Sequence, residues 1–355
     1  MTEAESSPPA GEQPAGAIPG WLQRVLDGID YPDADAAAAT HSRRLAVPAN
    51  SLGLLEVLGG WAAGVQGHCP PTAFPNTRLV LFAGDHGIAA AGVSNYPVEV
   101  TAQQLANISA GGAPLNALAG AAGVHVRLVD MSVDSATEPA VSNFKVGRSS
   151  GRIDVEDALS PAACHAAIEA GIAIADQEID AGGQLLIAAD LGVANSTPAA
   201  TLISVLTDSE PIKVVGRGSG IDDAGWIRKC AAIRDARRRA WPHRGELAEL
   251  LAVTGGADLA AMTGFILQAA YRRTPVLLDS MVVCAAALAA QLGCPRVVRW
   301  LQAAHLSPEP AHELALRRLG LEPIMKLDIS LGQGTGALVA LPILRAAALT
   351  VGRSN

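Results

Sequence analysis

Short apolar runs separated by longer helical patterns are the first feature of this chain. Five runs rich in Leu, Val and Ile have the length of buried strands: residues 78–83, 124–129, 184–189, 212–216 and 275–279. Strands that alternate with helical patterns predict βαβ units, and therefore a parallel sheet with helices on its faces. We expect an α/β fold with a Rossmann-like, doubly wound sheet.

The clearest helical pattern covers residues 161–180. Ser160 before it is a good N-cap, and Pro161 favours the first helical position. Three isoleucines fall on one face of this helix: Ile168, Ile172 and Ile179. The spacing therefore predicts an amphipathic helix.

The two ends of the chain differ from its middle. The stretches before about residue 75 and after about residue 300 have mostly helical patterns, and we expect them to form a small helical lobe beside the sheet. The predicted division is a disordered tail at 1–20, helices of the small lobe at 21–75, a large α/β domain at 76–300 and a C-terminal segment at 301–355. This last segment contributes a glycine-rich loop and helices shared with the small lobe.

Composition fits this fold and limits the function. Half of the 355 residues are hydrophobic but only 3% are aromatic, so small aliphatic side chains must build the core, as suits helices on a parallel sheet. The formal net charge of −8 argues against a nucleic-acid or anionic membrane surface. Five widely spaced cysteines indicate free thiols in a reducing compartment. The longest apolar run, from Met281, is too short to span a bilayer, and we expect a cytoplasmic protein.

Small and polar residues follow the predicted strands, where the carboxyl ends of a parallel sheet collect ligands. Asp85 and His86 come after the first strand, either as a turn with a satisfied hydrogen bond or as a catalytic dyad. Further on, a loop enters a helix at Val98, so that Tyr96 and Gln104 either face a pocket or lie on the surface. Because no metal-ligand spacing accompanies them, we predict no metal.

A second loop runs from Asp190 to Ser196. Thr197 or Ser196 can cap a helix whose first residue is Pro198. Free backbone N–H groups and the helix dipole would make this turn an anion site, although a well-capped βα turn has the same pattern.

A third loop, "GRGSG" at 216–220, follows the predicted 212–216 strand and allows a ligand to approach the backbone. It is not a GxGxxG motif, and no strand-end acid stands about twenty residues later, so a dinucleotide-binding dehydrogenase is disfavoured. Lys229 either reaches back as a counter-charge for a phosphate or is merely solvated.

A fourth loop, "SLGQGTGAL" at 330–338, has Gln333 between Gly332 and Gly334. Thr335 can cap the helix that follows, and Pro342 should kink it. Glycines this dense indicate a loop that faces a ligand. Four such loops at one edge of a sheet predict a phosphate-bearing substrate.

Several stretches of the chain resemble one known family and occur in that family's order. They include "FAGDHGIAAAGVSNYPVEVTAQQLANISAGGAPLNALA", "DLGVANSTPAA", "GRGSGIDDAGWIRK", "HLSPEPAHELAL" and "LGQGTGALVALPIL". These residues resemble the nicotinate-nucleotide–dimethylbenzimidazole phosphoribosyltransferases of cobalamin lower-ligand assembly. The likeness runs from about residue 25 to the C-terminus.

The resemblance implies a homodimer that needs no metal or other cofactor. It implies transfer of phosphoribose from nicotinate mononucleotide to 5,6-dimethylbenzimidazole or a related base, giving α-ribazole 5′-phosphate and nicotinate. The cationic nicotinate ring is a good leaving group. The protein must therefore position two rings, cradle the phosphate and remove the N–H proton of the acceptor.

The family's motifs also imply roles for individual residues. The base pocket would contain Tyr96, Gln104, Leu191 and Leu331. The nucleotide and its phosphate would be held by seven residues: Gly192, Asn195, Ser196, Gly216, Gly218, Lys229 and Ser307.

The chain departs from the family's pattern where the chemistry is expected. The family's C-terminal loop reads R-L-G-E-G-[ST]-G with Glu as the proposed general base, whereas this chain has Ser330 and Gln333 in place of Arg and Glu. Asp190 and Asp85 are the nearby acids that could replace the missing carboxylate. Further differences fall at Ala194 and Ser280.

The change at Gln333 leaves two functions open, because a general base typically supplies about 10²–10⁴ in rate. One is a phosphoribosyltransferase that passes the proton to another group or uses a different acceptor. The other is an impaired or regulatory member, which could form a heteromer with a complete paralogue.

Overall fold

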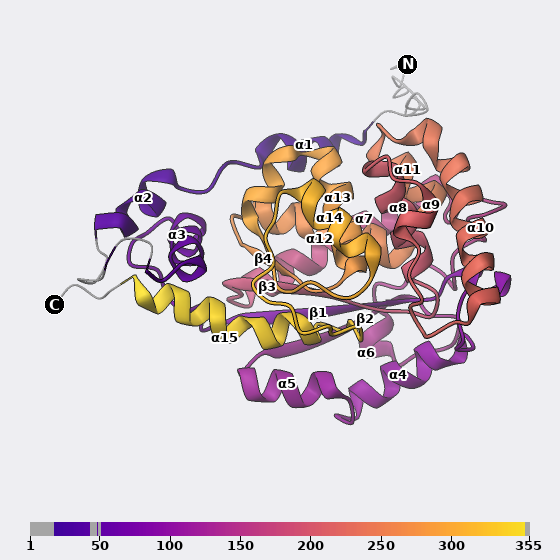
Figure 1. Ribbon diagram of the computed structural model, residues 1–355, viewed down its shortest axis with the longest axis horizontal. Helices are drawn as coiled ribbons and strands as arrows, with labels where there is room; N and C mark the ends of the chain where they lie inside the picture. Colours follow the sequence, from indigo (N-terminus) through magenta and orange to yellow (C-terminus); the bar gives the residue numbers. More distant parts are fainter. Residues whose placement is uncertain (1–17, 43–47, 49–50, 352–355) are drawn as a thin grey trace, which may run out of the picture.

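The computed structural model of the protein describes residues 18–42, 48 and 51–351 (Figure 1). Residues 1–17 of the expected disordered tail lie outside the described residues, and Gly20 already begins the first helix. Within the described part of the chain, no helix is both long and apolar enough to cross a membrane.

The secondary structure alternates along the chain as the apolar pattern predicts. The strands are β1 (Thr77–Gly84), β2 (His125–Ser132), β3 (Leu185–Leu191), β4 (Val276–Leu278) and β5 (Leu301–Ala303). The α-helices before β3 are α1 (Gly20–Gly28), α2 (Ala34–Ser42), α3 (Leu54–Gln66), α4 (Glu99–Ser109), α5 (Pro114–Ala122), α6 (Pro139–Ser142) and α7 (Pro161–Asp180). Those after β3 are α8 (Ser196–Leu206), α9 (Pro211–Val214), α10 (Asp223–Ala240), α11 (Leu247–Thr254), α12 (Ala257–Tyr271), α13 (Met281–Gly293), α14 (Pro310–Leu319) and α15 (Thr335–Thr350). Three 3₁₀ helices complete the described elements: η1 (Gly87–Ala91), η2 (Trp241–His243) and η3 (Pro295–Trp300).

The five strands form one parallel sheet in the order β2-β1-β3-β4-β5. This is a doubly wound order. β2 is added on one side of β1, and β3, β4 and β5 are added in turn on the other side, so the strand order switches between β1 and β3. Every residue of the central strand β3 is buried, because helices cover both faces of the sheet. Helices α12 and α13 lie on one face, and α4, α5 and α15 lie on the other (Figure 1). The expected α/β fold is confirmed.

Four of the five predicted strands are confirmed within a few residues, and one prediction is wrong. Residues 212–216 form the short helix α9 and the loop after it, because Pro211 takes the first helical position and leaves too few residues for a strand. The fifth strand is instead β5, in a region expected to be mostly helical.

The predicted helix at 161–180 is confirmed as α7, and the Ser160 hydroxyl accepts the N–H of Ala163 as an N-cap. A second prediction is wrong: α8 begins at Ser196, two residues before Pro198, and neither Ser196 nor Thr197 caps it. Helix α15 does contain Pro342.

The terminal helices pack in two different places. Helix α2 packs on α3, and α3 lies so close to α15 that a Cβ on Gly59 would be 3.0 Å from the carbonyl oxygen of Ala347. In Figure 1, α2 and α3 form a small lobe at the left, and α15 runs from this lobe to beneath the sheet. Helix α1 lies instead beside α12, where Gly28 meets the ring of Tyr271. The division of the chain into four segments stays a prediction.

Two buried glycines allow α7 and α12 to cross at very short range. A Cβ on Gly171 would lie 1.9 Å from the carbonyl oxygen of Ala261, and one on Gly264 would lie 2.2 Å from that of Ile168. Neither carbonyl can move without separating the two helices. The close crossing therefore requires glycine at both positions, because any side chain would push the helices apart.

Gly171→Ala should lower the free energy of unfolding by about 1–3 kcal/mol, because the added methyl group has no room at the crossing. Urea denaturation measures this change. Gly120→Ala is the matched control, since no atom lies within 4 Å of a Cβ at that position in α5. The control should be neutral or stabilising by up to about 1 kcal/mol. Equal effects of the two substitutions would contradict the close crossing.

Candidate active site

A pocket of about 530 Å³ opens at the carboxyl ends of the strands, next to the topological switch point between β1 and β3. Its walls come from the loop and helix after β1, the turn after β3, the starts of the segments after β4 and β5, and residues 330–333. Four of the strand-end segments thus meet in one cavity, as expected for a doubly wound sheet.

Most of the predicted site residues line this pocket. The eleven that do are Tyr96, Gln104, Asp190, Leu191, Gly192, Asn195, Ser196, Gly218, Ser307, Leu331 and Gln333. Gly216 and Lys229 do not line it. Gly216 lies against the Glu309 carboxylate, and Lys229 is buried one layer behind the wall.

Gln333 lies in a strained loop at the end of the pocket nearest α15. Gly332, Gln333 and Gly334 all have positive φ angles, of 70°, 58° and 78°. This region suits glycine but costs a residue with a Cβ about 1 kcal/mol or more. The Gln333 side chain is buried, and its Oε1 has no hydrogen-bond partner among the described residues. An amide oxygen held in this way is ready to accept a hydrogen bond from a ligand.

The carboxylate of Asp279, directly after β4, holds this loop in place. Its Oδ2 accepts the N–H of Gly334 at 2.9 Å, and its Oδ1 accepts the N–H of Ala337 at 2.8 Å. Asp279 is fully buried, and burial raises its pKa to about 6. The first backbone N–H groups of a helix have no carbonyl partner within the helix, and the Asp279 carboxylate accepts two of them at the start of α15.

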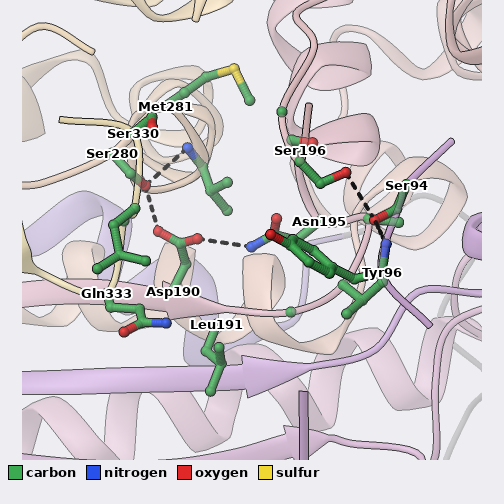
Figure 2. A pocket seen from close by; sticks show the side chains of 18 of the residues that line it. Ser94, Tyr96, Asp190, Leu191, Asn195, Ser196, Ser280, Met281, Ser330 and Gln333 are labelled. Atoms are coloured by element: carbon green, nitrogen blue, oxygen red, sulfur yellow. Dashed lines mark hydrogen bonds between the residues drawn. The ribbon is translucent and has the colours of Figure 1, made fainter. Parts of the chain in front are cut away.

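Asp190, at the end of β3, is a second acid beside the Gln333 loop, and unlike Asp279 it lines the pocket. It accepts hydrogen bonds from the Ser280 hydroxyl at 2.5 Å and from Asn195 Nδ2 at 2.8 Å, as Figure 2 shows. A Cβ placed on Gly332 would lie 3.3 Å from its Oδ1. Burial raises the pKa of Asp190 to about 7, although the Ser280 hydrogen bond works in the opposite direction. A carboxyl with this pKa can exchange a proton near neutrality.

Asp85 and His86 lie beneath the pocket and do not line it. Asp85 accepts the Thr101 hydroxyl at 2.5 Å, and the same hydroxyl accepts the N–H of Val193 at 2.9 Å in the pocket wall. His86 pairs with Asp258 at 3.2 Å, with both side chains buried. Burial is the largest single influence and opposes charge on His86, but the Asp258 carboxylate, helped by Asp85 and Asp190, outweighs it and raises the His86 pKa. The geometry makes Asp85 a positioning residue for the turn after β3.

The turn from Gly192 to Ser196 leads into α8, whose N-terminus faces the pocket's polar end. The buried Lys229 donates to the Ser196 hydroxyl at 2.9 Å from behind the wall. Burial lowers the Lys229 pKa, and the nearby Glu309 carboxylate opposes this. A helix N-terminus backed by a lysine suits an anionic group. Ala194 in this turn has a φ of 68°, the second strained residue of the pocket.

Part of the pocket mouth is apolar and partly open. Tyr96 is 56% exposed and Leu331 is 49% exposed, whereas Leu191 is buried in the wall. Exposed apolar side chains at a pocket rim provide a surface on which a flat ring can lie. The two ends thus differ in chemistry, one suited to an anion and the other to an aromatic ring.

Several pocket residues were not predicted as site residues from the sequence. They are Thr101, Ser219, Ser280, Met281, His305 and Glu309. Ser280 follows β4, which the sequence predicted, so the strand-end rule already pointed to it. His305 follows β5 and would have been found by the same rule had β5 been recognised. Among the described residues, no group of three or more His, Cys, Asp or Glu side chains could hold a metal ion.

Comparison with known proteins identifies the family. A family profile described as "Phosphoribosyltransferase" matches residues 29–353. Proteins named nicotinate-nucleotide–dimethylbenzimidazole phosphoribosyltransferase from Mycobacterium tuberculosis and Mycobacterium marinum are each 54% identical to this chain over 322 residues. The match covers 90% of this chain and 89% and 90% of those proteins. The chain belongs to this phosphoribosyltransferase family.

Solved structures of the family share the fold of this chain. The crystal structure of a nicotinate-nucleotide–dimethylbenzimidazole phosphoribosyltransferase from Thermus thermophilus has a TM-score of 0.86 at 36% identity. That comparison covers 91% of this chain and 97% of the Thermus chain. The resemblance inferred from the motifs is thereby confirmed over nearly the whole chain.

Asp279→Ala should lower the free energy of unfolding by about 2–4 kcal/mol, because it leaves two buried N–H groups without an acceptor. Chemical denaturation measures the change. Asp222→Ala is the matched control, since Asp222 caps the exposed start of α10 with a single bond to Gly225 N–H. The control should cost only about 1 kcal/mol. A loss no larger than the control's would show that Asp279 is not needed to hold α15.

Proposed function

We propose that this protein transfers the 5-phosphoribosyl group of nicotinate mononucleotide to 5,6-dimethylbenzimidazole or a related base. One feature supports the proposal beyond family membership: a single pocket has one end at Ser196, backed by Lys229, that suits an anion, and another end at Gln333, whose Oε1 has no partner among the described residues, that suits a ring. A nucleotide and a second ring need both ends at once.

Different residues along the pocket contact the phosphate and the acceptor ring. The phosphate lies at the start of α8, near Ser196, Gly218 and Ser307, with Lys229 behind the wall supplying positive charge. The acceptor ring lies on Leu331, Leu191 and Tyr96, with its N–H directed to Gln333 Oε1. This arrangement brings the other ring nitrogen of the acceptor to the ribose.

The transfer breaks one C–N bond and forms another. The acceptor's free nitrogen attacks the anomeric carbon of the ribose as the bond to nicotinate breaks, and nicotinate leaves with the bonding electron pair. The acceptor's N–H proton must then be removed. Gln333 accepts its hydrogen bond but cannot take the proton, so we assign the proton to the Asp190 carboxylate, whose pKa is raised to about 7 by burial.

Assembly and location remain predictions. We propose a homodimer, because the family resemblance implies one. Exposed apolar side chains such as Val57 on α3 and Leu349 on α15 leave surface for a second subunit. A heteromer with a paralogue and a cytoplasmic location are expectations from the sequence.

Mixing the protein with nicotinate mononucleotide and 5,6-dimethylbenzimidazole should release nicotinate, and Gln333→Glu should raise kcat by about 10- to 100-fold, because the carboxylate adds a well-placed base. Chromatography of the products measures both. The buried Gln268, far from the pocket loops in α12, serves as the control through Gln268→Glu, which should give no gain. Ligand binding without any turnover would favour the regulatory alternative.

The pH dependence tests the role of Asp190. Its active form is the carboxylate and its folded pKa is raised to about 7, so kcat/KM should fall about tenfold per pH unit below that pH and level off above it. Asp190→Asn should remove this acid limb and lower kcat by about 10²–10⁴. If kcat/KM of the Asp190→Asn variant still falls in the same way at low pH, the ionisation belongs to another group, such as the substrate phosphate.

A further inference from the structure

His305 is a buried side chain of the pocket for which neither the sequence motifs nor the proposed transfer gives a role. It follows β5, as Asp190 ends β3 and Ser280 comes just after β4, and all three line the pocket. Since β3, β4 and β5 are adjacent in the sheet, these three residues form its floor. The His305 residue is only 2% exposed.

The contacts of His305 hold its ring, but neither ring nitrogen forms a well-formed hydrogen bond among the described residues. The ring packs on Gly336, where a Cβ would lie 2.0 Å from Cδ2, and its edge meets His312 at 5.7 Å between centroids. Its Nε2 is 3.7 Å from Asp279 Oδ1, too far for a hydrogen bond. The backbone of Leu306 and of Asp279 lies close enough to favour a proton on the ring, but neither ring nitrogen forms a hydrogen bond of ordinary geometry with a described residue. A buried polar atom without a partner costs about 1–3 kcal/mol, so a fixed, unpaired imidazole in a pocket indicates a ligand.

The neighbouring His312 shows what a satisfied histidine looks like in the same environment. Its Nδ1 accepts the N–H of Ser307 at 3.1 Å and lies 2.9 Å from the Ser307 hydroxyl. The proton must therefore be on Nε2, which is 3.4 Å from Cys284 Sγ. Burial lowers the pKa of His312 to about 3 and keeps it neutral. Both histidines are buried, but of the two only His312 forms well-formed hydrogen bonds with described residues.

The position of His305 between the two ends of the pocket identifies the part of the substrate that it meets. Ser307, two residues later, lies at the phosphate end, whereas Gly336 belongs to the loop and helix start that carry Gln333 at the base end. In a mononucleotide, the ribose lies between base and phosphate. Burial also lowers the pKa of His305, so the ring is neutral, with one donor and one acceptor nitrogen. A hydroxyl can pair with either nitrogen, whereas the nicotinate carboxylate, which only accepts hydrogen bonds, can pair with the donor nitrogen alone.

We propose that His305 binds a ribose hydroxyl of the donor nucleotide and makes the protein specific for ribonucleotide donors. The proposal rests on the proposed function and deepens it, because it assigns recognition of the sugar to a residue outside the base and phosphate sites. His305 acts on binding and orientation of the ribose, and it takes no proton in the transfer.

The test compares nicotinate mononucleotide with its 2′-deoxy and 3′-deoxy analogues as donors. In the unmodified protein, one deoxy donor should lose about 5- to 100-fold in kcat/KM, because it leaves His305 unpaired. His305→Phe, which keeps a ring against Gly336, should lose a similar factor with the ribose donor and show no further loss with that deoxy donor. The KM for the acceptor base should stay unchanged, and His305→Gln should restore part of the loss.

Two controls separate recognition from packing. His312→Asn alters the adjacent buried histidine, so any loss it causes should be the same for ribose and deoxy donors. His41→Asn, on the exposed surface of α2, should match the unmodified protein. If His305→Phe keeps the full sensitivity to the deoxy donor, or if the unmodified protein does not discriminate between donors, the proposal is wrong.

Further outcomes distinguish this proposal from the proposed function. If His305→Phe changes the preference between nicotinate and nicotinamide mononucleotides, His305 recognises the carboxylate and the ribose assignment fails. If the unmodified protein binds the donor without turnover, the proposed transfer fails. In that case, calorimetric Kd values of the ribose and deoxy donors, measured for the unmodified protein and for His305→Phe, test the role of His305 independently.

Discussion

The buried carboxylate of Asp279 is the contact on which the rest of the site depends. It joins the end of β4 to the first turn of α15 through two backbone hydrogen bonds, at Gly334 and Ala337. Helix α15 also packs on α3 and α5, so one ionised side chain connects the sheet, the Gln333 loop and the small lobe. At neutral pH the Asp279 carboxyl is above its pKa of about 6, and its negative charge lies at the positive end of the helix dipole.

A second layer of polar contacts fixes the turn after β3 in the same way. Asp85 accepts a hydrogen bond from the Thr101 hydroxyl, which in turn accepts the N–H of Val193. Asp190 accepts hydrogen bonds from both Ser280 and Asn195. These side chains come from different strand-end segments, so the pocket is rigid before any ligand enters it. A rigid pocket matters for phosphoribosyl transfer, because positioning two rings and a phosphate supplies much of the rate.

The sequence predicted the fold better than the location of each side chain. Strands such as 184–189 were found because a central parallel strand is continuously apolar, and Ser160 with Pro161 marked α7 because caps act locally. The strand at 212–216 failed because a short run with three β-branched residues after a proline fits a helical turn equally well. Lys229 was expected to reach the phosphate directly, but its depth depends on how α10 packs, which no local pattern reveals. His305 was missed because β5 has only three residues and its partner strands are distant in sequence.

The backbone around Gln333 bears on whether this loop has decayed or still acts on a ligand. Gln333 and Ala194 have positive φ angles, a conformation that costs each residue about 1 kcal/mol or more compared with a relaxed loop. A loop without a function would be free to relax, yet Asp279 and the flanking glycines keep the Gln333 amide oxygen buried and unpaired. An amide and a carboxylate have nearly the same shape, so the loop can still accept a ligand N–H at this position. In the proposed transfer, hydrogen bonding to the acceptor and removal of its proton are divided between Gln333 and Asp190, and the second task falls to a carboxyl whose pKa burial raises to about 7.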